Sequence, residues 1–373
     1  MEKLNLISPV NNLGYGVVGH NLLKHLAQKL DIALFPVGGI DVERNTAELV
    51  EQVIRSARNF KDRASAPCLK VWHEFDLAMR VGFGPYYAFP FFELNKIDDK
   101  RLNHLSSTDG IIVASKWAQE ILNQHSSLVD KTSVVPLGVD TSVFNHSTSN
   151  ITNDTCIFFN CGKWEKRKGH DILLEMFQKA FPEQADVELW VLASNPFIDE
   201  KSRDEWERYY SSDTRVKIIS RVDTQHQVAY LMSQANCGVF PSRAEGWNLE
   251  LLEMMAMGKH VITTNYSAHT EFCNENNSRL INIQQLEPAQ DGVFFDGSIG
   301  EWASLEGEPF DEGVDHMRAF YQEWQSNHNI VNEHGLQTAQ ELSWSNTATQ
   351  LEEVIYGNPS TKTIENNTVT NQA

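Results

Sequence analysis

The sequence predicts an α/β protein built from two doubly wound domains that face each other across a cleft. Apolar strand-like runs alternate with helical patterns along almost the whole chain. The alternation starts twice, because a polar segment rich in Ser, Thr and Asn interrupts it at residues 146–155. The length of 373 residues is too great for one ordinary hydrophobic core and fits two domains.

The N-terminal domain is predicted over residues 1–145, and residues 146–155 are predicted to be a linker. Strands are expected at 4–7, 32–35, 69–72, 109–115 and 133–136, and a strand followed by an acceptor-facing loop is expected within 85–92. Helices are expected at 17–29, 45–60 and 116–124. Most of these strands are short apolar runs, which is typical of parallel strands buried on both faces. Ser115 is a good N-cap residue and marks the start of the last helix.

Gly14 and Gly16 lie in the loop between the first strand and the first helix. Such a loop can bring backbone N–H groups close to a phosphate at a helix N-terminus. The full dinucleotide-binding fingerprint is missing, so a plain tight turn is the competing interpretation.

His73 and Glu74 directly follow the strand at 69–72. The carboxyl ends of parallel strands are where α/β proteins bind ligands, so both side chains are candidates for a site. His73 can act as a general base or orient a hydroxyl group. A lone His is more often a structural hydrogen-bonding residue, and that interpretation stays open.

The C-terminal domain is predicted over residues 156–335. Strands are expected at 156–161, 187–192, 216–219, 237–240 and 260–264, with a small one at 294–296. Helices are expected at 170–181, 203–210, 225–234, 248–258, 315–327 and 331–356. Residues 336–357 are expected to pack back toward the N-terminal domain, and the polar residues 358–373 are predicted to be a disordered tail.

Four cations lie within six residues of the loop after the strand at 156–161. They are Lys163, Lys166, Arg167 and Lys168. The next helix begins at His170, and a helix N-terminus favours anions. The position therefore indicates an anion-binding loop, although most basic clusters are solvated surface.

Residues 241–264 form the stretch around which the predicted site is organised. The apolar strand at 237–240 leads into a loop containing Glu245 and Gly246, and a helix follows from about Asn248 to Gly258. Glu253 lies on that helix, eight positions after Glu245. Glu250 lies about 60° further round the helix from Glu253 and is predicted to be a surface residue.

Composition limits the partners of the chain. The formal net charge of −19 argues against a broad nucleic-acid-binding face or electrostatic docking on an anionic membrane. It leaves a small basic pocket, a local groove and contact with a membrane surface open. The chain has no signal peptide, no apolar run long enough to span a membrane and no C-x-x-C cysteine pair, so we expect a cytoplasmic protein.

The motifs resemble those of retaining GT-B glycosyltransferases of the glycogen-synthase-like group, the family-four (group 1) enzymes. The matching residues are Gly162-Lys163, Lys168-Gly169, the run Pro241 to Gly246, Glu253 completing an E-x7-E pair, and Val135 to Asp140 before the linker. The resemblance covers nearly the whole chain and is strongest over 135–265. It implies the GT-B fold of two Rossmann-like domains and transfer of a sugar from a nucleotide-diphosphate sugar.

The resemblance also implies roles for residues on the donor side. Lys163, where the family usually has Arg, and Lys168 would neutralise the leaving diphosphate. Glu245 would lie beside the hydroxyls of the donor sugar, and Glu253 would accept hydrogen bonds from the ribose. Backbone groups would contribute the remaining donor contacts, at Gly246, Trp247, Asn248, Leu249 and, near the base, Arg221 and Val222.

On the acceptor side the family often has a His near the reaction centre, for which His73 is the candidate and Glu93 the rival. No D-x-D triplet occurs, so neither a metal nor another cofactor is expected. The predicted function is transfer of a hexosyl or pentosyl group from a UDP- or GDP-sugar to a glycan or small-molecule hydroxyl. Two alternatives remain: an inactive sugar-nucleotide-binding or scaffold subunit, and a transferase acting on modified DNA bases.

Overall fold

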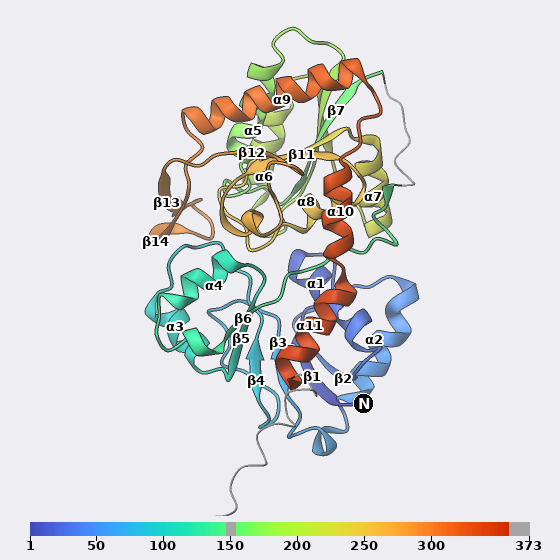
Figure 1. Cartoon of the computed structure of the whole chain (residues 1–373), viewed down its shortest axis with the longest axis vertical. Coiled ribbons are helices and arrows are strands. Elements are labelled where there is room, and N and C mark those ends of the chain that lie inside the picture. Colours follow the sequence, from blue (N-terminus) through green and yellow to red (C-terminus); the bar gives the residue numbers. More distant parts are fainter. Residues whose placement is uncertain (147–153, 358–373) are drawn as a thin grey trace, which may run out of the picture.

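The structure, a computed structural model, describes residues 1–146 and 154–357 and contains two stacked α/β domains (Figure 1). Each domain has a six-stranded sheet whose strands all run parallel. The predicted fold class of two doubly wound domains is therefore confirmed. The expectations for residues 147–153 of the linker and for the tail at 358–373 lie outside the described residues.

The N-terminal sheet has the strand order β2-β1-β3-β4-β5-β6. Its strands are β1 (Lys3–Ser8), β2 (Asp31–Pro36), β3 (Cys68–Lys70), β4 (Tyr86–Ala88), β5 (Gly110–Val113) and β6 (Thr132–Val134). Its helices are α1 (Gly14–Leu26), α2 (Arg44–Ser56), α3 (Asp99–Ser106) and α4 (Lys116–Asn123), with 3-10 turns at Phe60–Asp62 and Val129–Lys131. Ser115 caps α4 as predicted, its Oγ accepting a hydrogen bond from Ala118 N.

The C-terminal sheet has the strand order β12-β11-β10-β7-β8-β9. Its strands are β7 (Cys156–Gly162), β8 (Val187–Ala193), β9 (Val216–Ile219), β10 (Cys237–Phe240), β11 (His260–Thr264) and β12 (Arg279–Ile281). Its helices are α5 (His170–Ala180), α6 (Glu200–Tyr210), α7 (Gln225–Gln234), α8 (Leu249–Ala256) and α9 (Glu308–Ser326), with a 3-10 helix at Ser267–Glu271. The apolar strand residues are buried, as the sequence pattern required.

A β-hairpin replaces the small strand predicted at 294–296. It consists of β13 (Leu286–Gln290) and β14 (Asp296–Ala303), and Phe294 and Phe295 lie in its turn. The hairpin contacts the N-terminal domain, where Trp302 Nε1 donates to the Glu93 carbonyl at 3.0 Å. This contact fixes the backbone of Glu93 at the interface between the domains.

The single helix predicted at 331–356 is wrong, because two helices occupy that range. They are α10 (Glu333–Glu341) and α11 (Trp344–Tyr356), and the Ser343 Oγ caps α11 by accepting from Asn346 N at 3.2 Å. A residue used as an N-cap has non-helical backbone angles, so the chain bends there. Figure 1 shows α10 reaching down from the C-terminal domain, and α11 lies against α1 of the N-terminal domain.

Candidate functional site

A cavity of about 610 Å³ lies between the domains and is lined by loops at the carboxyl ends of both sheets. It brings together every residue predicted for the donor side, together with His73 and Glu93. The predicted donor-side residues in its lining are Gly14, Gly16, Lys163, Lys168, Arg221, Val222, Glu245, Gly246, Trp247, Asn248, Leu249 and Glu253. Gly14 and Gly16 were predicted to lie in a loop, but they lie in the first turn of α1, and Leu249 and Glu253 lie on α8. The set spans more than 200 positions of the sequence, so the fold is what assembles it.

A close backbone contact joins the β7–α5 loop to the β10–α8 loop. Gly169 has φ of +76°, and a Cβ at this position would lie 2.2 Å from the Pro241 carbonyl oxygen, so a side chain does not fit. Arg243 N donates to the Arg167 carbonyl at 2.7 Å, beside this contact. The cations of one loop are thereby placed next to the acids of the other.

Arg167 is the main site residue that the sequence interpretation missed. Its guanidinium is buried and binds the Glu245 carboxylate at 2.8 Å and the Glu165 carboxylate at 2.7 Å. Lys163 Nζ lies 2.7 Å from Glu165, and Lys168 Nζ lies 3.1 Å from Glu245. Arg167 was visible as one of four clustered cations, but only its tertiary contacts distinguish it from exposed Lys166.

Glu245 is held in one position as an ionised carboxylate. Burial alone would raise the pKa of Glu245, but Lys168 and Arg167 outweigh burial and hold that pKa far below its usual range. Ser242 Oγ also donates to the carboxylate at 2.8 Å. The group is therefore an acceptor of hydrogen bonds, not a proton donor, at neutral pH.

The first turn of α8 faces the cavity with free backbone donors. Asn248, in the left-handed region at φ +84°, caps the helix by accepting from Leu251 N. The first N–H groups of a helix have no partner inside it, so the N–H groups of Leu249 and Glu250 remain available for an anion. The Trp247 side chain is buried against Phe272, at 4.8 Å between ring centroids, so its backbone is what reaches the cavity.

Glu253 is 7% exposed, and its carboxylate makes no hydrogen bond or ion pair with any residue that the structure describes. Burial, followed by the charge of Glu250, raises the pKa of Glu253 well above its usual range. A buried polar group without a partner is costly, so the position calls for a ligand that donates hydrogen bonds.

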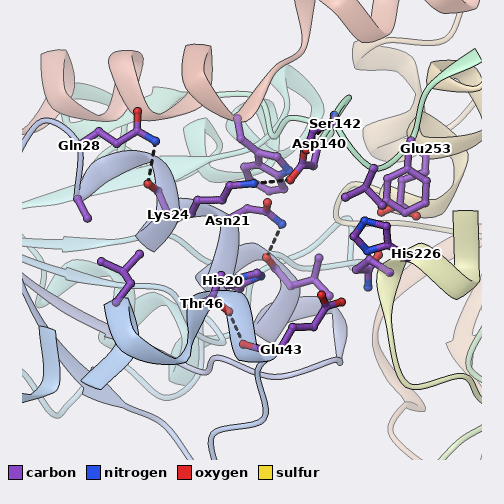
Figure 2. Close-up of a pocket in the computed structure, with 17 residues that line it drawn as sticks. His20, Asn21, Lys24, Gln28, Glu43, Thr46, Asp140, Ser142, His226 and Glu253 are labelled. Atoms are coloured by element: carbon purple, nitrogen blue, oxygen red, sulfur yellow. Dashed lines mark hydrogen bonds and ion pairs between the residues drawn. The ribbon is translucent and has the colours of Figure 1, made fainter. Parts of the chain in front are cut away.

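Glu253 also borders a second cavity, of about 560 Å³, near the segment that joins the domains. Figure 2 shows Glu253 on the same side of this cavity as His226, with the Lys24–Asp140 ion pair (2.8 Å) across it. Glu253 therefore lines both cavities.

The prediction that Glu250 is a surface residue is wrong. Its side chain is 28% exposed, lines the cavity between the domains and lies 4.0 Å from Lys168 Nζ. Rotation about the helix axis correctly separates Glu250 from Glu253. The β7–α5 loop, however, covers the side of α8 that was expected to face solvent.

Two candidate acceptor-side residues reach the cavity. The His73 ring stacks on Phe75 at 4.9 Å between centroids, and burial together with Lys163 lowers the pKa of His73 to about 4. Burial raises the pKa of Glu93 to about 7, although Arg167 at 3.9 Å opposes that shift. The two groups therefore titrate in different pH ranges.

The third candidate, Glu74, does not belong to the cavity lining. Its buried carboxylate accepts a hydrogen bond from Arg101 Nε at 2.8 Å. The cause is the turn after β3, which directs this side chain toward α3 and away from the cleft. Its role in this structure is an internal ion pair.

The described residues contain no group of three or more His, Cys, Asp or Glu arranged to hold a metal ion. Within the same residues, no helix is both long and apolar enough to cross a membrane.

The two domains and the cavity between them have the arrangement of the GT-B glycosyltransferase fold. Sucrose-phosphate synthase from Thermosynechococcus elongatus superimposes with a TM-score of 0.65 at 17% identity, covering 95% of this chain and 98% of that one. HepE of Anabaena, solved with UDP and glucose, superimposes with a TM-score of 0.66 at 14% identity, covering 95% of this chain and 99% of HepE. WaaG, a glycosyltransferase involved in lipopolysaccharide biosynthesis, superimposes with a TM-score of 0.64 at 11% identity, covering 96% of this chain and 100% of WaaG.

The sequence comparison is more specific for the C-terminal half. Residues 155–290 match the family model of group 1 glycosyl transferases. This segment contains the cation cluster and both acids of the E-x7-E pair. No curated protein sequence matches the chain.

Proposed function

We propose that the protein is a retaining glycosyltransferase that moves a hexosyl or pentosyl group from a UDP- or GDP-sugar to a hydroxyl acceptor without a metal ion. The acceptor is a glycan or a small molecule, and the setting is glycan or polysaccharide synthesis in the cytoplasm. The observation that carries the proposal is the partnerless buried carboxylate of Glu253. It shares one cavity with a helix N-terminus and four cations, Lys163, Arg167, Lys168 and Arg221.

The chemistry of the reaction assigns the donor-side roles. Departure of a nucleoside diphosphate leaves negative charge, which Lys163, Lys168 and the first turn of α8 would stabilise. The Glu253 carboxylate would accept hydrogen bonds from the two hydroxyls of the ribose. The Glu245 carboxylate, held by Arg167, would accept hydrogen bonds from the hydroxyls of the donor sugar. The HepE structures, which hold UDP with glucose or UDP-glucose, support a nucleotide sugar as the ligand of this fold.

Retention follows from an attack on the face from which the diphosphate leaves. The anomeric C–O bond to phosphate breaks, the acceptor oxygen bonds to the same face, and the hydroxyl proton passes to the leaving phosphate or to a nearby base. The cavity offers no carboxylate pair that we can assign as nucleophile and acid. The cations take the charge-neutralising role that a metal has in other phosphoryl leaving-group reactions.

Binding of a nucleotide is the first test of the proposal. UDP or GDP at 100 times its dissociation constant is expected to add about 2.7 kcal/mol to the free energy of unfolding. Thermal unfolding with UDP, GDP, ADP and their sugars, in EDTA, measures this effect. A protein that none of them stabilises does not bind a nucleotide-sugar donor, and a shift that requires added Mg²⁺ contradicts metal independence.

Transfer assays then separate the alternatives. Stabilisation by a nucleotide without hydrolysis or transfer of its sugar would indicate a sugar-binding or scaffold subunit. Transfer to modified bases in DNA but not to glycans would indicate the DNA-modifying alternative. The net charge of −19 makes that outcome physically unfavourable.

The pH dependence of transfer is expected to identify the acceptor-side base. A base works in its deprotonated form, so a role for Glu93 predicts a rate that rises as the pH passes through about 7. A role for His73 instead places that rise near pH 4. The Glu93→Gln variant should lose the rise near 7, and the profile of kcat/KM from pH 4 to 9 measures it. A Glu93→Gln profile identical to that of the wild type excludes Glu93.

A further inference from the structure

Three of the four cations that line the donor cavity are already paired with acidic side chains of the protein, and the fourth, exposed Arg221, makes no ion pair with the described residues. Lys163, Arg167 and Lys168 face four carboxylates, those of Glu93, Glu165, Glu245 and Glu250, at 2.7 to 4.0 Å. With all seven groups ionised, the cluster has a formal charge of −1. A diphosphate adds about two further negative charges next to this cluster, so its binding beside Lys168 is favoured when a nearby carboxylate gives up its place or its charge.

Two of the four carboxylates are held too firmly to move. Glu165 binds Lys163 and Arg167, both at 2.7 Å, and its side chain is 4% exposed. Glu245 binds Arg167 and Lys168 at 2.8 and 3.1 Å and is 5% exposed. Displacing Glu165 would break the short ion pairs to Lys163 and Arg167, and displacing Glu245 would break those to Arg167 and Lys168. Breaking two short ion pairs in a buried cluster is strongly unfavourable.

Glu93 is constrained in a different way. Its carboxylate lies 3.9 Å from Arg167, and its backbone carbonyl is held by the Trp302 indole of the interdomain hairpin. Movement of this side chain would not release a lysine, because Arg167 is its one cationic partner in the described part of the chain.

Glu250 is the carboxylate that is least restrained. Lys168, at 4.0 Å, is its one charged partner among the described residues, and its carboxylate accepts no hydrogen bond from them. It lies in the first turn of α8, beside backbone donors suited to an anion. We propose that Glu250 competes with the donor phosphates for Lys168 and the α8 N-terminus, so that donor binding displaces its carboxylate and Glu250 sets donor affinity.

The same movement affects Glu253, one turn further along the helix. Glu250 contributes to the raised pKa of Glu253. Withdrawal of the Glu250 carboxylate therefore favours the ionised form of Glu253, which is the better acceptor for ribose hydroxyls. This coupling rests on the proposed function, because it requires a nucleotide diphosphate as the ligand.

Isothermal titration with UDP and GDP tests the role of Glu250. Glu250→Gln is expected to lower the dissociation constant about five- to tenfold at low salt, since removal of a like charge within a few ångströms relieves repulsion. Glu250→Lys should lower it further, and both gains should shrink in 0.5 M salt. Glu353→Gln, which removes an exposed charge on α11, should leave the affinity unchanged.

The outcomes separate this inference from the proposed function. If the wild-type protein binds neither UDP nor GDP nor their sugars, both the proposed function and the displacement of Glu250 are refuted. Wild-type binding with unchanged affinity in Glu250→Gln overturns the displacement alone. Weaker binding in Glu250→Gln also overturns it, because the carboxylate would then be a contact of the ligand. Matching thermal midpoints without nucleotide show that the variants are folded.

Discussion

Replacing Lys168 with Ala is expected to lower the rate of sugar transfer by about 10² to 10³, the loss typical of removing one preorganised charge-stabilising group. The lysine is buried beside the α8 N-terminus and 3.1 Å from Glu245. Burial would lower the pKa of Lys168, but the carboxylates of Glu245 and Glu250 outweigh burial and raise that pKa, so the group stays cationic. The Lys168 ammonium group would therefore stabilise the negative charge that develops on the departing diphosphate.

The variant is expected to fold, because Glu245 keeps its 2.8 Å ion pair with Arg167. Single-turnover transfer under saturating donor measures the chemical step apart from binding. Lys179→Ala is the matched control, since Lys179 lies on α5 and pairs at the surface with Asp311. A Lys168→Ala protein that transfers sugar as fast as this control would remove the lysine from the reaction.

The sheets were predictable because their strands are short apolar runs separated by turn and capping residues. Parallel strands buried on both faces leave this pattern regardless of their neighbours, so β7 to β11 appear in the sequence almost at their observed bounds. The hairpin β13–β14 leaves no such pattern. Polar and glycine residues interrupt its apolar positions, and Trp302 is buried by contacts remote in sequence, among them Leu94 and the Glu93 carbonyl of the N-terminal domain.

The break between α10 and α11 was missed for a related reason. Helical periodicity continues across Leu342 and Ser343, and a Ser is tolerated inside helices. The fold uses Ser343 as an N-cap, and Val139 N donates to the Leu342 carbonyl, so the chain turns from one domain to the other. Tertiary contacts therefore override local propensity at that point.

The two acids of the E-x7-E pair were predictable as a motif, but their different states were not. Glu245 is ionised because a loop 78 positions away in the chain brings Arg167 to it. Glu253 has no partner because no described residue places a hydrogen-bond donor or a cation against its buried carboxylate. The sequence equally could not place Glu250 in the cavity. Pairing of charges depends on how closely the two loops approach, which Gly169 and Pro241 determine.

Replacing Glu253 with Gln is expected to have opposite effects on binding and on stability. The amide cannot be ionised, so the contact with the ribose hydroxyls loses its charge-assisted strength, and the dissociation constant for UDP or GDP should rise about tenfold. The unliganded protein should become more stable at neutral pH, because the amide does not titrate and avoids the cost of keeping a buried carboxyl protonated above its usual pKa, about 1.4 kcal/mol for each unit by which folding raises the pKa. Glu253 would therefore strengthen nucleotide binding while lowering the stability of the unliganded protein.

The stability gain should depend on pH in a defined direction. The pKa of Glu253 in the folded state lies above the usual value of 4.5, so the folded protein favours the protonated carboxyl. Its contribution to stability is present below about pH 4.5 and is lost as the pH rises through the folded pKa. Urea unfolding of wild type and Glu253→Gln should therefore agree near pH 4.5 and diverge above it. Glu353→Gln serves as the control for an exposed carboxylate, and a constant difference from pH 4.5 to 8 would show that folding does not raise the pKa of Glu253.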